Sequence, residues 1–254
     1  MSSSLPEYYS GLGPFRSWFG AGVPILMYHK LGPRPRGARL KGLTVGAPLF
    51  ERQLAELRAA GFQSALPGNL RLGADNASRQ IVITFDDGFQ NVLEYGLEPL
   101  AAHGFQAIQF LVADALGKTN AWDAPLGEVQ EPIMDAPAVR DWLKAGHQIG
   151  AHSLSHPYLT RLETARAREE IVSSKSKLED LFGLPIRHFC YPYGDWNASV
   201  HDLVCEAGYE TACTTDWGLN TAATDRLALK RIMGRYPSRG LRAMLGWLRR
   251  RLRA

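Results

Sequence analysis

The chain has 254 residues, of which 45% are hydrophobic and 21% charged, and this balance suits one large α/β domain or two small ones. The formal net charge of +4 is mild, and there is neither a basic stripe interleaved with aromatic residues nor a known nucleic-acid-reading motif, so we expect no nucleic-acid partner. The three cysteines form no Cys-x-x-Cys pair, the N-terminus has no secretory-signal pattern, and no apolar run is long. These features predict a cytoplasmic protein, although a trimmed exported protein would share them.

Short apolar runs and amphipathic stretches alternate along the chain after an irregular start. Residues 1–20 are rich in Ser, Gly, Pro and aromatic residues without a period, and we expect them to form an N-terminal arm. The apolar runs predict strands over residues 23–29, 81–83, 107–112, 148–152, 188–191 and 211–214. The remaining pattern predicts helices over residues 49–60, 90–103, 138–145, 161–182 and 199–207, with loops over 32–48 and 114–134.

This alternation is typical of βα units around a parallel sheet. It predicts an α/β fold, a distorted (β/α) barrel of about seven strands. Because no repeat or linker interrupts the pattern, residues 21–237 are expected to form a single domain.

Residues 238–254 predict a basic amphipathic C-terminal helix. Leu241, Leu245, Leu248 and Leu252 recur at helical spacing among a dense set of arginines. One interpretation is a terminal helix that packs its leucines on the barrel. The other is peripheral membrane contact, with the helix lying on anionic lipid.

Two adjacent carboxylates, Asp86 and Asp87, follow the apolar run and precede Gly88. Burying two like charges side by side is costly without a cation or a shared proton, and a glycine beside them permits a tight turn. Because α/β barrels carry their chemistry at the carboxyl ends of the strands, the pair predicts one half of an active site. The dipeptide alone would also fit a turn on a surface loop.

Two histidines four residues apart, His152 and His156, close another apolar strand. Pro157 disfavours helical geometry at His156, so we expect both on a strand end and the loop that follows. Two imidazoles and one carboxylate make a three-ligand set with one open position, the pattern of catalytic zinc, and the other carboxylate is then free to act as a base. A purely structural histidine pair is the alternative.

Three motifs together resemble those of a known family. The polysaccharide deacetylase family, also called the NodB-homology or carbohydrate esterase 4 family, has its first three motifs matched in order by Thr84-Phe85-Asp86-Asp87-Gly88, His152-Ser-Leu-Ser-His156 and Tyr191-Pro192-Tyr193-Gly194. The resemblance covers roughly residues 22–236. It implies a divalent metal ion, most often Zn²⁺, and hydrolysis of N-acetyl groups on amino sugars.

The same resemblance implies roles for individual residues. Asp86 would be the general base, and the metal ligands would be Asp87, His152 and His156. The backbone N–H of Tyr193 would help bind the oxyanion, and Tyr191 of the same motif is a further candidate for substrate binding.

The chain departs from the family pattern at two places. Cys190 stands where the family usually has the arginine that holds the base aspartate, and the late Leu-x-His that supplies the acid in many members is absent. The segments Leu26-Met27-Tyr28-His29 and Leu229-Lys230-Arg231-Ile232 resemble instead the branch in which the barrel is circularly permuted. This branch implies His29 as the general acid and Arg231 as the partner of Asp86; a structural histidine at a strand end is the alternative for His29.

Asp216-Trp217 resembles the family's fourth motif, an aspartate beside an aromatic wall for the sugar, although a structural Thr-Asp-Trp-Gly turn would have the same sequence. Trp122 and Trp196 are further candidates for stacking on a sugar.

The sequence therefore predicts a metal-dependent hydrolase that removes N-acetyl or O-acetyl groups from an amino-sugar-containing carbohydrate. For a cytoplasmic protein with a lipid-binding helix, that carbohydrate would be a lipid-linked precursor. A related hydrolase of non-peptide carbon–nitrogen bonds, such as a deformylase, is one alternative. The other is a catalytically inactive barrel that binds carbohydrate, an interpretation that the missing arginine favours.

Overall fold

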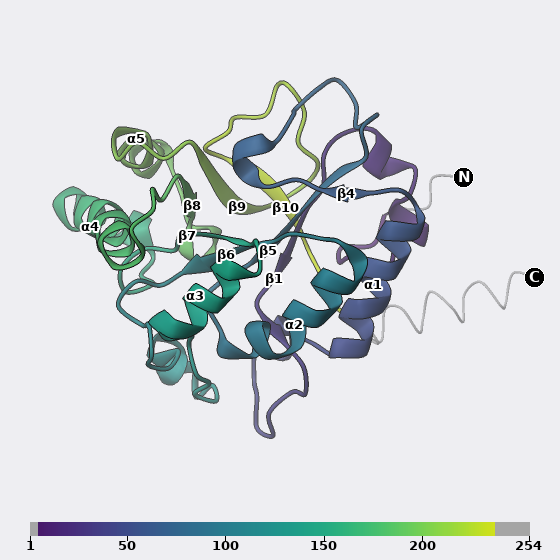
Figure 1. Cartoon of the computed structure of the whole chain (residues 1–254). Helices are drawn as coiled ribbons and strands as arrows, with labels where there is room; N and C mark the ends of the chain where they lie inside the picture. Colours follow the sequence, from purple (N-terminus) through teal and green to yellow (C-terminus); the bar gives the residue numbers. More distant parts are fainter. Residues whose placement is uncertain (1–4, 237–254) are drawn as a thin grey trace, which may run out of the picture.

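Seven parallel strands form a closed ring in the computed structural model, which describes residues 5–236 (Figure 1). Around the ring the order is β1 (Ile25–Tyr28), β10 (Leu229–Met233), β9 (Thr211–Trp217), β8 (His188–Cys190), β7 (Gln148–Ala151), β6 (Ile108–Leu111) and β5 (Gln80–Phe85). The barrel closes because β5 also pairs with β1, in a register that aligns Ile25 with Val82 and Tyr28 with Phe85. The predicted α/β barrel of about seven strands in a single domain is confirmed.

Three shorter strands lie outside this ring. β4 (Gln63–Ser64) pairs in parallel with the first residues of β5. β2 (Lys30–Leu31) and β3 (Thr44–Val45) pair with each other beyond the end of β1. Within residues 5–236, no helix is both long enough and apolar enough to cross a lipid bilayer.

Five α-helices lie outside the barrel: α1 (Ala47–Ala59), α2 (Gln90–His103), α3 (Ala136–Lys144), α4 (Thr164–Phe182) and α5 (Ala198–Glu206) (Figure 1). The predicted helix 90–103 coincides with α2, and the other four predictions differ from the structure by up to three residues at an end. Two starts are fixed by side-chain caps, because Asp135 accepts a hydrogen bond from the backbone N–H of Ala138 and Asn197 from that of Val200, both at 2.9 Å.

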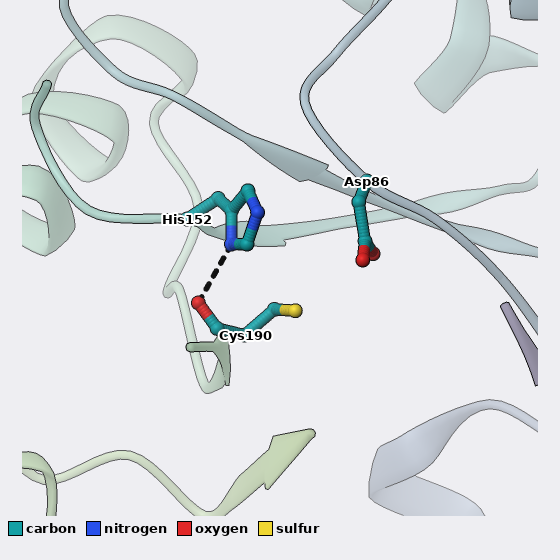
Figure 2. Close-up of side chains that lie close together, drawn as sticks. All are labelled: Asp86, His152 and Cys190. Atoms are coloured by element: carbon teal, nitrogen blue, oxygen red, sulfur yellow. Dashed lines mark hydrogen bonds between the residues drawn. The ribbon is translucent and has the colours of Figure 1, made fainter. Parts of the chain in front are cut away.

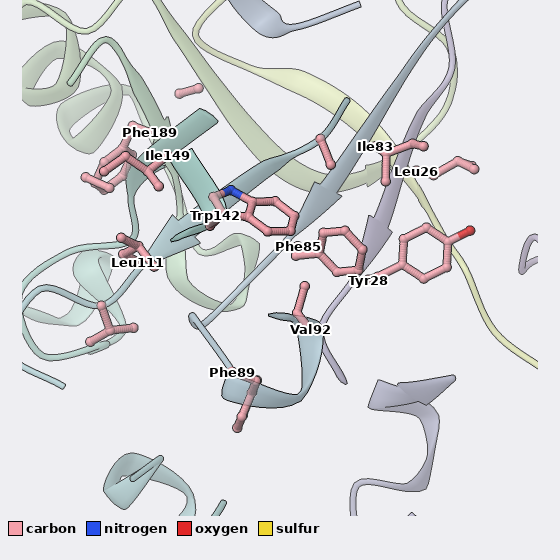
Figure 3. Packing of buried hydrophobic residues seen from close by; sticks show 14 of the residues in the cluster. Leu26, Tyr28, Ile83, Phe85, Phe89, Val92, Leu111, Trp142, Ile149 and Phe189 are labelled. Carbon is pink, nitrogen blue, oxygen red and sulfur yellow. The ribbon is translucent and has the colours of Figure 1, made fainter. Parts of the chain in front are cut away.

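β5 shows how the barrel divides its side chains between two cores. Ile81, Ile83 and Phe85 belong to the large outer cluster beneath the helices, whereas Val82 belongs to the smaller cluster inside the barrel. In the outer cluster the Phe85 ring packs edge-on against Trp142 of α3, with ring centroids 6.0 Å apart (Figure 3). Continuing the alternation, Asp86 has the orientation of Val82 and Thr84 and therefore points into the carboxyl end of the barrel.

One glycine on β7 is required by close packing inside the barrel. A Cβ atom at Gly150 would lie 2.7 Å from the carbonyl oxygen of His188 and 2.7 Å from the ring of Phe110. These distances are shorter than van der Waals contact, so any side chain here would displace a strand or the Phe110 ring.

The N-terminal segment is part of the packed structure, so the prediction of an arm over residues 1–20 is wrong for the residues that the structure describes. Two short 3-10 helices, Gly13–Phe15 and Trp18–Gly20, replace the irregular chain that we expected. Tyr9, Phe15 and Phe19 are fully buried in the outer cluster, and their rings pack on one another with centroids 5.4–5.8 Å apart. The backbone of Tyr9 bridges to Gly234, which follows β10, and its carbonyl oxygen accepts a hydrogen bond from Gln53 of α1. The predicted C-terminal helix over residues 238–254 lies outside the described residues.

Both predicted loops contain short elements. The segment 32–48 includes a 3-10 helix (Lys41–Leu43) and β3, and the segment 114–134 includes a longer 3-10 helix (Ala121–Leu126). The carboxylate of Glu128 joins the two segments by accepting a hydrogen bond from the backbone N–H of Arg39 at 2.9 Å. These segments therefore form one connected wall beside the carboxyl ends of the strands.

Candidate active site

The carboxyl ends of the barrel strands surround a cavity of about 420 Å³. His29 follows β1, Asp86 and Asp87 follow β5, and His152 follows β7. Tyr193 lies just after β8, and all five residues line the cavity. The aspartate pair and the histidine pair, which are far apart in the sequence, therefore meet at one mouth, as we predicted from the parallel strands.

The backbone of this site is strained. Among residues 5–236, only five non-glycine residues have a positive φ, and four of them lie in the site segments: Asp87 (75°), Ser153 (62°), His156 (66°) and Tyr193 (60°). A non-glycine residue in the left-handed region costs about 1–3 kcal/mol and persists where the surrounding structure enforces it. Such positions concentrate at functional sites, which marks this cavity independently of its residue types.

Asp87, His152 and His156 bring three ligand atoms together. Asp87 Oδ1 lies 3.4 Å from His152 Nε2 and 3.3 Å from His156 Nε2. All three residues are at most 6% exposed. Two ligand atoms bound tetrahedrally to zinc at about 2.0–2.1 Å are about 3.3 Å apart, so the observed separations fit a divalent ion of this kind.

The ring of His152 is oriented from outside the ligand set. Its Nδ1 lies 2.7 Å from the carbonyl oxygen of Cys190 and donates to it (Figure 2), and its Nε2 lies 3.4 Å from Asp87 Oδ1. A carbonyl partner of this kind sets the tautomer that a metal-binding histidine requires. The ring of His156 packs against Trp122, with ring centroids 4.8 Å apart.

Asp86 has a different partner from its neighbour. Arg231 of β10 donates two parallel hydrogen bonds to it, from Nη1 to Oδ1 at 2.7 Å and from Nη2 to Oδ2 at 2.8 Å. Burial alone would raise the pKa of Asp86, but the Arg231 charge and these hydrogen bonds hold that pKa below its usual range. The structure thus contains the Asp86–Arg231 pair that we inferred from the permuted motifs, and Asp86 is an ionised carboxylate at neutral pH.

The small side chain of Cys190 leaves space beside Asp86 for an arginine from another strand. Its Sγ lies 3.1 Å from Arg231 Nη2, so the small thiol leaves room for the guanidinium group beside Asp86. Burial raises the pKa of Cys190 to about 11, which keeps the thiol neutral. Asp86, His152 and Cys190 also lie close enough to suggest a second metal site (Figure 2), but the guanidinium of Arg231 bonds to both Asp86 and Cys190 and would repel a cation there.

His29 directly follows β1, and its side chain is 15% exposed. Its Nε2 is 3.9 Å from Asp86 Oδ2, too far for a hydrogen bond but within the same cavity. A histidine placed beside both the carboxylate and the solvent-accessible cavity can exchange protons with a bound molecule.

Two predicted substrate-binding residues lie elsewhere. Asp216 and Trp217 end β9 rather than forming a turn, and neither lines the cavity. Trp217 stacks on Trp18 with centroids 4.5 Å apart, and Asp216 Oδ2 accepts a hydrogen bond from Trp196 Nε1 at 3.4 Å. A bulge between β9 and β10 shifts the register here, so the wall that we predicted at Asp216 and Trp217 is not formed around this cavity.

Two tyrosines from the third motif are placed differently from each other. Tyr191 contributes to the cavity lining, but its hydroxyl donates to the carbonyl oxygen of Leu227 at 2.9 Å and is engaged there. Tyr193 is 38% exposed and stacks on Tyr158, with ring centroids 3.9 Å apart. Tyr158 and Tyr193 both line the cavity, so their stacked rings offer a flat aromatic surface at its rim.

The sequence analysis missed several cavity residues. Asp123 is a buried carboxylate that lines the cavity next to Trp122. The apolar part of the lining comes from loops and from strand ends, and it includes Met27, Leu40, Leu43, Leu126 and Met233. The only signal in the sequence was the position of Asp123 beside a tryptophan already considered for sugar stacking, because loop residues carry no periodic pattern.

Comparisons with known proteins agree on one family. The family model for polysaccharide deacetylases matches residues 73–212, which include Asp86, Asp87, His152, His156 and Tyr193. The protein YxkH of Bacillus subtilis, whose name places it among polysaccharide deacetylases, is 25% identical over 216 residues, which cover 84% of this chain and 71% of YxkH. The peptidoglycan-N-acetylglucosamine deacetylase PgdA of Listeria monocytogenes is 26% identical over 60% of this chain, but the match spans only 30% of PgdA.

Solved structures support the same barrel. A polysaccharide deacetylase from Bacillus cereus is similar with a TM-score of 0.72 and 23% identity, over 87% of this chain and 67% of that one. The Streptococcus pyogenes deacetylase PplD, solved in complex with acetate, gives a TM-score of 0.71 with 21% identity, over 89% of this chain and 98% of that one. At these identities the likeness concerns the fold.

Proposed function

Because the chain belongs to the polysaccharide deacetylase family, we propose that it is a metal-dependent hydrolase that removes acetyl groups from an amino-sugar-containing carbohydrate. The observation that carries the proposal is that the adjacent aspartates contact different groups. Asp87 lies with His152 and His156 in a three-ligand set, whereas Asp86 is paired with Arg231. A protein that only binds sugar needs no free carboxylate beside a metal site. The names of PgdA and of a chitin deacetylase from Pestalotiopsis support N-acetylglucosamine polymers as the substrate class.

Asp87, His152 and His156 would hold the ion, and their donor set of one carboxylate and two imidazoles suits Zn²⁺. When bound there, a divalent ion would polarise the acetyl carbonyl and lower the pKa of a water molecule. The Cys190 carbonyl contributes by fixing the His152 ring.

The chain's own residues supply the proton transfers. Asp86, ionised and oriented by Arg231, accepts a proton from the attacking water. His29, whose Nε2 lies 3.9 Å from Asp86 Oδ2 in the same cavity, donates a proton to the leaving amine. The backbone N–H of Tyr193, in the strained turn after β8, is the donor for the negative charge that develops on the acetyl oxygen.

Arg231 also bears on the rival interpretation of an inactive sugar-binding barrel. That interpretation relied on Cys190 at the place of the usual arginine. Arg231 of β10 donates two hydrogen bonds to Asp86, so an arginine from another strand takes the place of the one that is missing from the third motif. We therefore favour the enzyme.

The test is metal analysis combined with acetate release from tetra-N-acetylchitotetraose. The wild-type chain should hold about one divalent ion and release acetate, whereas His152→Ala should lose the ion and the activity together. His29→Ala should keep the ion and lower turnover, because it acts on the leaving group alone. Tight sugar binding without acetate release by the metal-loaded wild type would support the binding protein instead.

A further inference from the structure

A second carboxylate in the cavity, Asp123, has no place in the mechanism above. It lies in the 3-10 helix Ala121–Leu126, in the wall formed by residues 114–134, and is 4% exposed while lining the cavity. It is not within the group of ligand atoms formed by Asp87, His152 and His156. Asp123 is therefore neither the base nor a metal ligand.

A fully buried asparagine holds Asp123 in position. Asn120 Nδ2 donates to Asp123 Oδ2 at 3.0 Å, and Asn120 Oδ1 accepts from the backbone N–H of Glu131 at 2.7 Å. Glu131 in turn pairs with Lys30 through a 2.6 Å contact between Oε1 and Nζ. Lys30 follows His29, so this buried network fixes Asp123 relative to the residue that we assign as the acid.

The other oxygen of Asp123 is unpaired. Among residues 5–236 no side chain or backbone group donates to Oδ1, and Lys30, the cation of this network, pairs with Glu131. Oδ1 is open to the cavity rather than sealed in the protein interior, so a donor can reach it from the cavity side. Because the residue lines the cavity, a bound molecule is the group that can supply this donor.

We propose that Asp123 accepts a hydrogen bond from a hydroxyl group of the carbohydrate and thereby selects sugars over simple acetylated amines and esters; this inference rests on the proposed function. A sugar brings several hydroxyl donors and no charge, which fits a buried acceptor with one free oxygen. The adjacent Trp122 also lines the cavity, where it packs against His156, so an aromatic ring lies beside Asp123 at the site. Asp123 is thus a substrate-binding residue that determines specificity.

The experiment measures affinity separately from hydrolysis. Calorimetry is performed on the zinc-loaded chain carrying Asp86→Asn, which slows turnover by on the order of a hundredfold or more, with and without Asp123→Ala. Tetra-N-acetylchitotetraose should bind about 10- to 100-fold more weakly when Asp123 is replaced, the range for a hydrogen bond to a charged group. Asp123→Asn, which keeps the shape, should have a smaller effect. Acetate release by the chain with Asp86 intact tests the proposed function independently.

The hydroxyl is identified with methyl glycosides of N-acetylglucosamine that each lack one hydroxyl group. For one of these deoxy analogues the Asp123→Ala effect should disappear, because the interaction has been removed from both sides. In the chain with Asp86 intact, hydrolysis of 4-nitrophenyl acetate, which has no hydroxyl group, should be unchanged by Asp123→Ala.

Matched controls keep the result interpretable. Asp114→Asn alters a carboxylate at the start of the same wall that is 48% exposed and paired with Lys177, and it should leave sugar affinity unchanged. The inference is overturned if Asp123→Ala leaves sugar affinity intact, if no deoxy analogue removes its effect, or if aryl ester hydrolysis and zinc content fall in parallel with sugar binding.

Discussion

Asp86 and Asp87 are neighbours in the chain but contact different groups. The positive φ of Asp87, 75°, turns the backbone between them, so that Asp86 faces Arg231 and Asp87 faces the two histidines. Burial would raise the pKa of Asp87, but the neighbouring imidazole groups of His152 and His156 hold that pKa well below its usual range. At the scale of single residues, one strained dihedral angle therefore separates the carboxylate that we propose as the base from the one that we propose as a metal ligand.

Asn substitutions should separate the two roles. Asp87→Asn should weaken zinc binding, because a neutral amide is a poorer ligand than a carboxylate. Asp86→Asn should keep the zinc and lower turnover by on the order of a hundredfold or more, the contribution of a general base. Zinc content by mass spectrometry and acetate release decide this, and the opposite pairing of phenotypes would reverse our assignment.

Arg231 should contribute to stability mainly through its pairing with Asp86. It is 1% exposed, and its guanidinium group donates to Asp86, Thr84, the carbonyl oxygen of Thr214 and Cys190 Sγ. Arg231→Met should lower the free energy of unfolding by about 3–5 kcal/mol, since it leaves Asp86 buried and unpaired. In the double variant with Asp86→Asn the loss should be smaller than the sum of the single losses. Additive losses in urea unfolding would show that the two residues do not interact.

How far the sequence predicts these residues depends on whether the signal is local. Asp86, Asp87, His152 and His156 are recognisable because each pair ends an apolar strand. The pairing of Arg231 with Asp86 was accessible only through the permuted motifs, because 145 positions separate the two residues in the chain. Asp123 and Asn120 were missed, since their roles depend on a loop whose shape no periodic pattern encodes.

At the scale of elements, the strands with long apolar runs were predicted and the short ones were not. β2, β3 and β4 have two residues each, too few for an alternation to be visible. β10 was not predicted as a strand because Lys230 and Arg231 interrupt its apolar residues; Lys230 faces outward, and Arg231 occupies the barrel interior. A charge inside a barrel strand is thus a functional exception to the pattern that identifies strands.

The aromatic N-terminal segment provides a test at this scale. Phe19 is fully buried and contacts Tyr9, Phe15 and Phe62, with ring centroids 5.4–6.0 Å apart. Phe19→Ala should lower the free energy of unfolding by about 3–5 kcal/mol, as for other buried phenylalanines. Val172→Ala, at a position that is 38% exposed on α4, should change it by less than about 1 kcal/mol. Equal small effects in both variants would show that the N-terminal segment contributes little to the stability of the barrel.

At the scale of the whole molecule, the barrel carries different ionisable groups at its two ends. The carboxyl end holds the aspartates of the site, and the amino end holds His147 before β7 and His188 at the start of β8. His147 Nδ1 accepts a hydrogen bond from the backbone N–H of Ala107 at 3.3 Å, and His188 Nδ1 lies 2.9 Å from Thr211 Oγ1. Burial lowers the pKa of both histidines to about 4, so the folded barrel keeps them neutral at pH 7.

These two histidines should set an acid limit to stability that is independent of catalysis. In the unfolded chain they bind protons near their ordinary pKa of about 6.5, whereas in the folded chain they do so only near pH 4. Between these values the unfolded state holds more protons, so the free energy of unfolding should decrease as the pH falls, and their full contribution should be present only above about pH 6.5. His188→Asn removes one titrating group while keeping a polar atom near Thr211. Urea unfolding between about pH 7 and pH 5 should therefore show a shallower loss of stability for this variant, and an identical slope for variant and wild type would contradict the assignment.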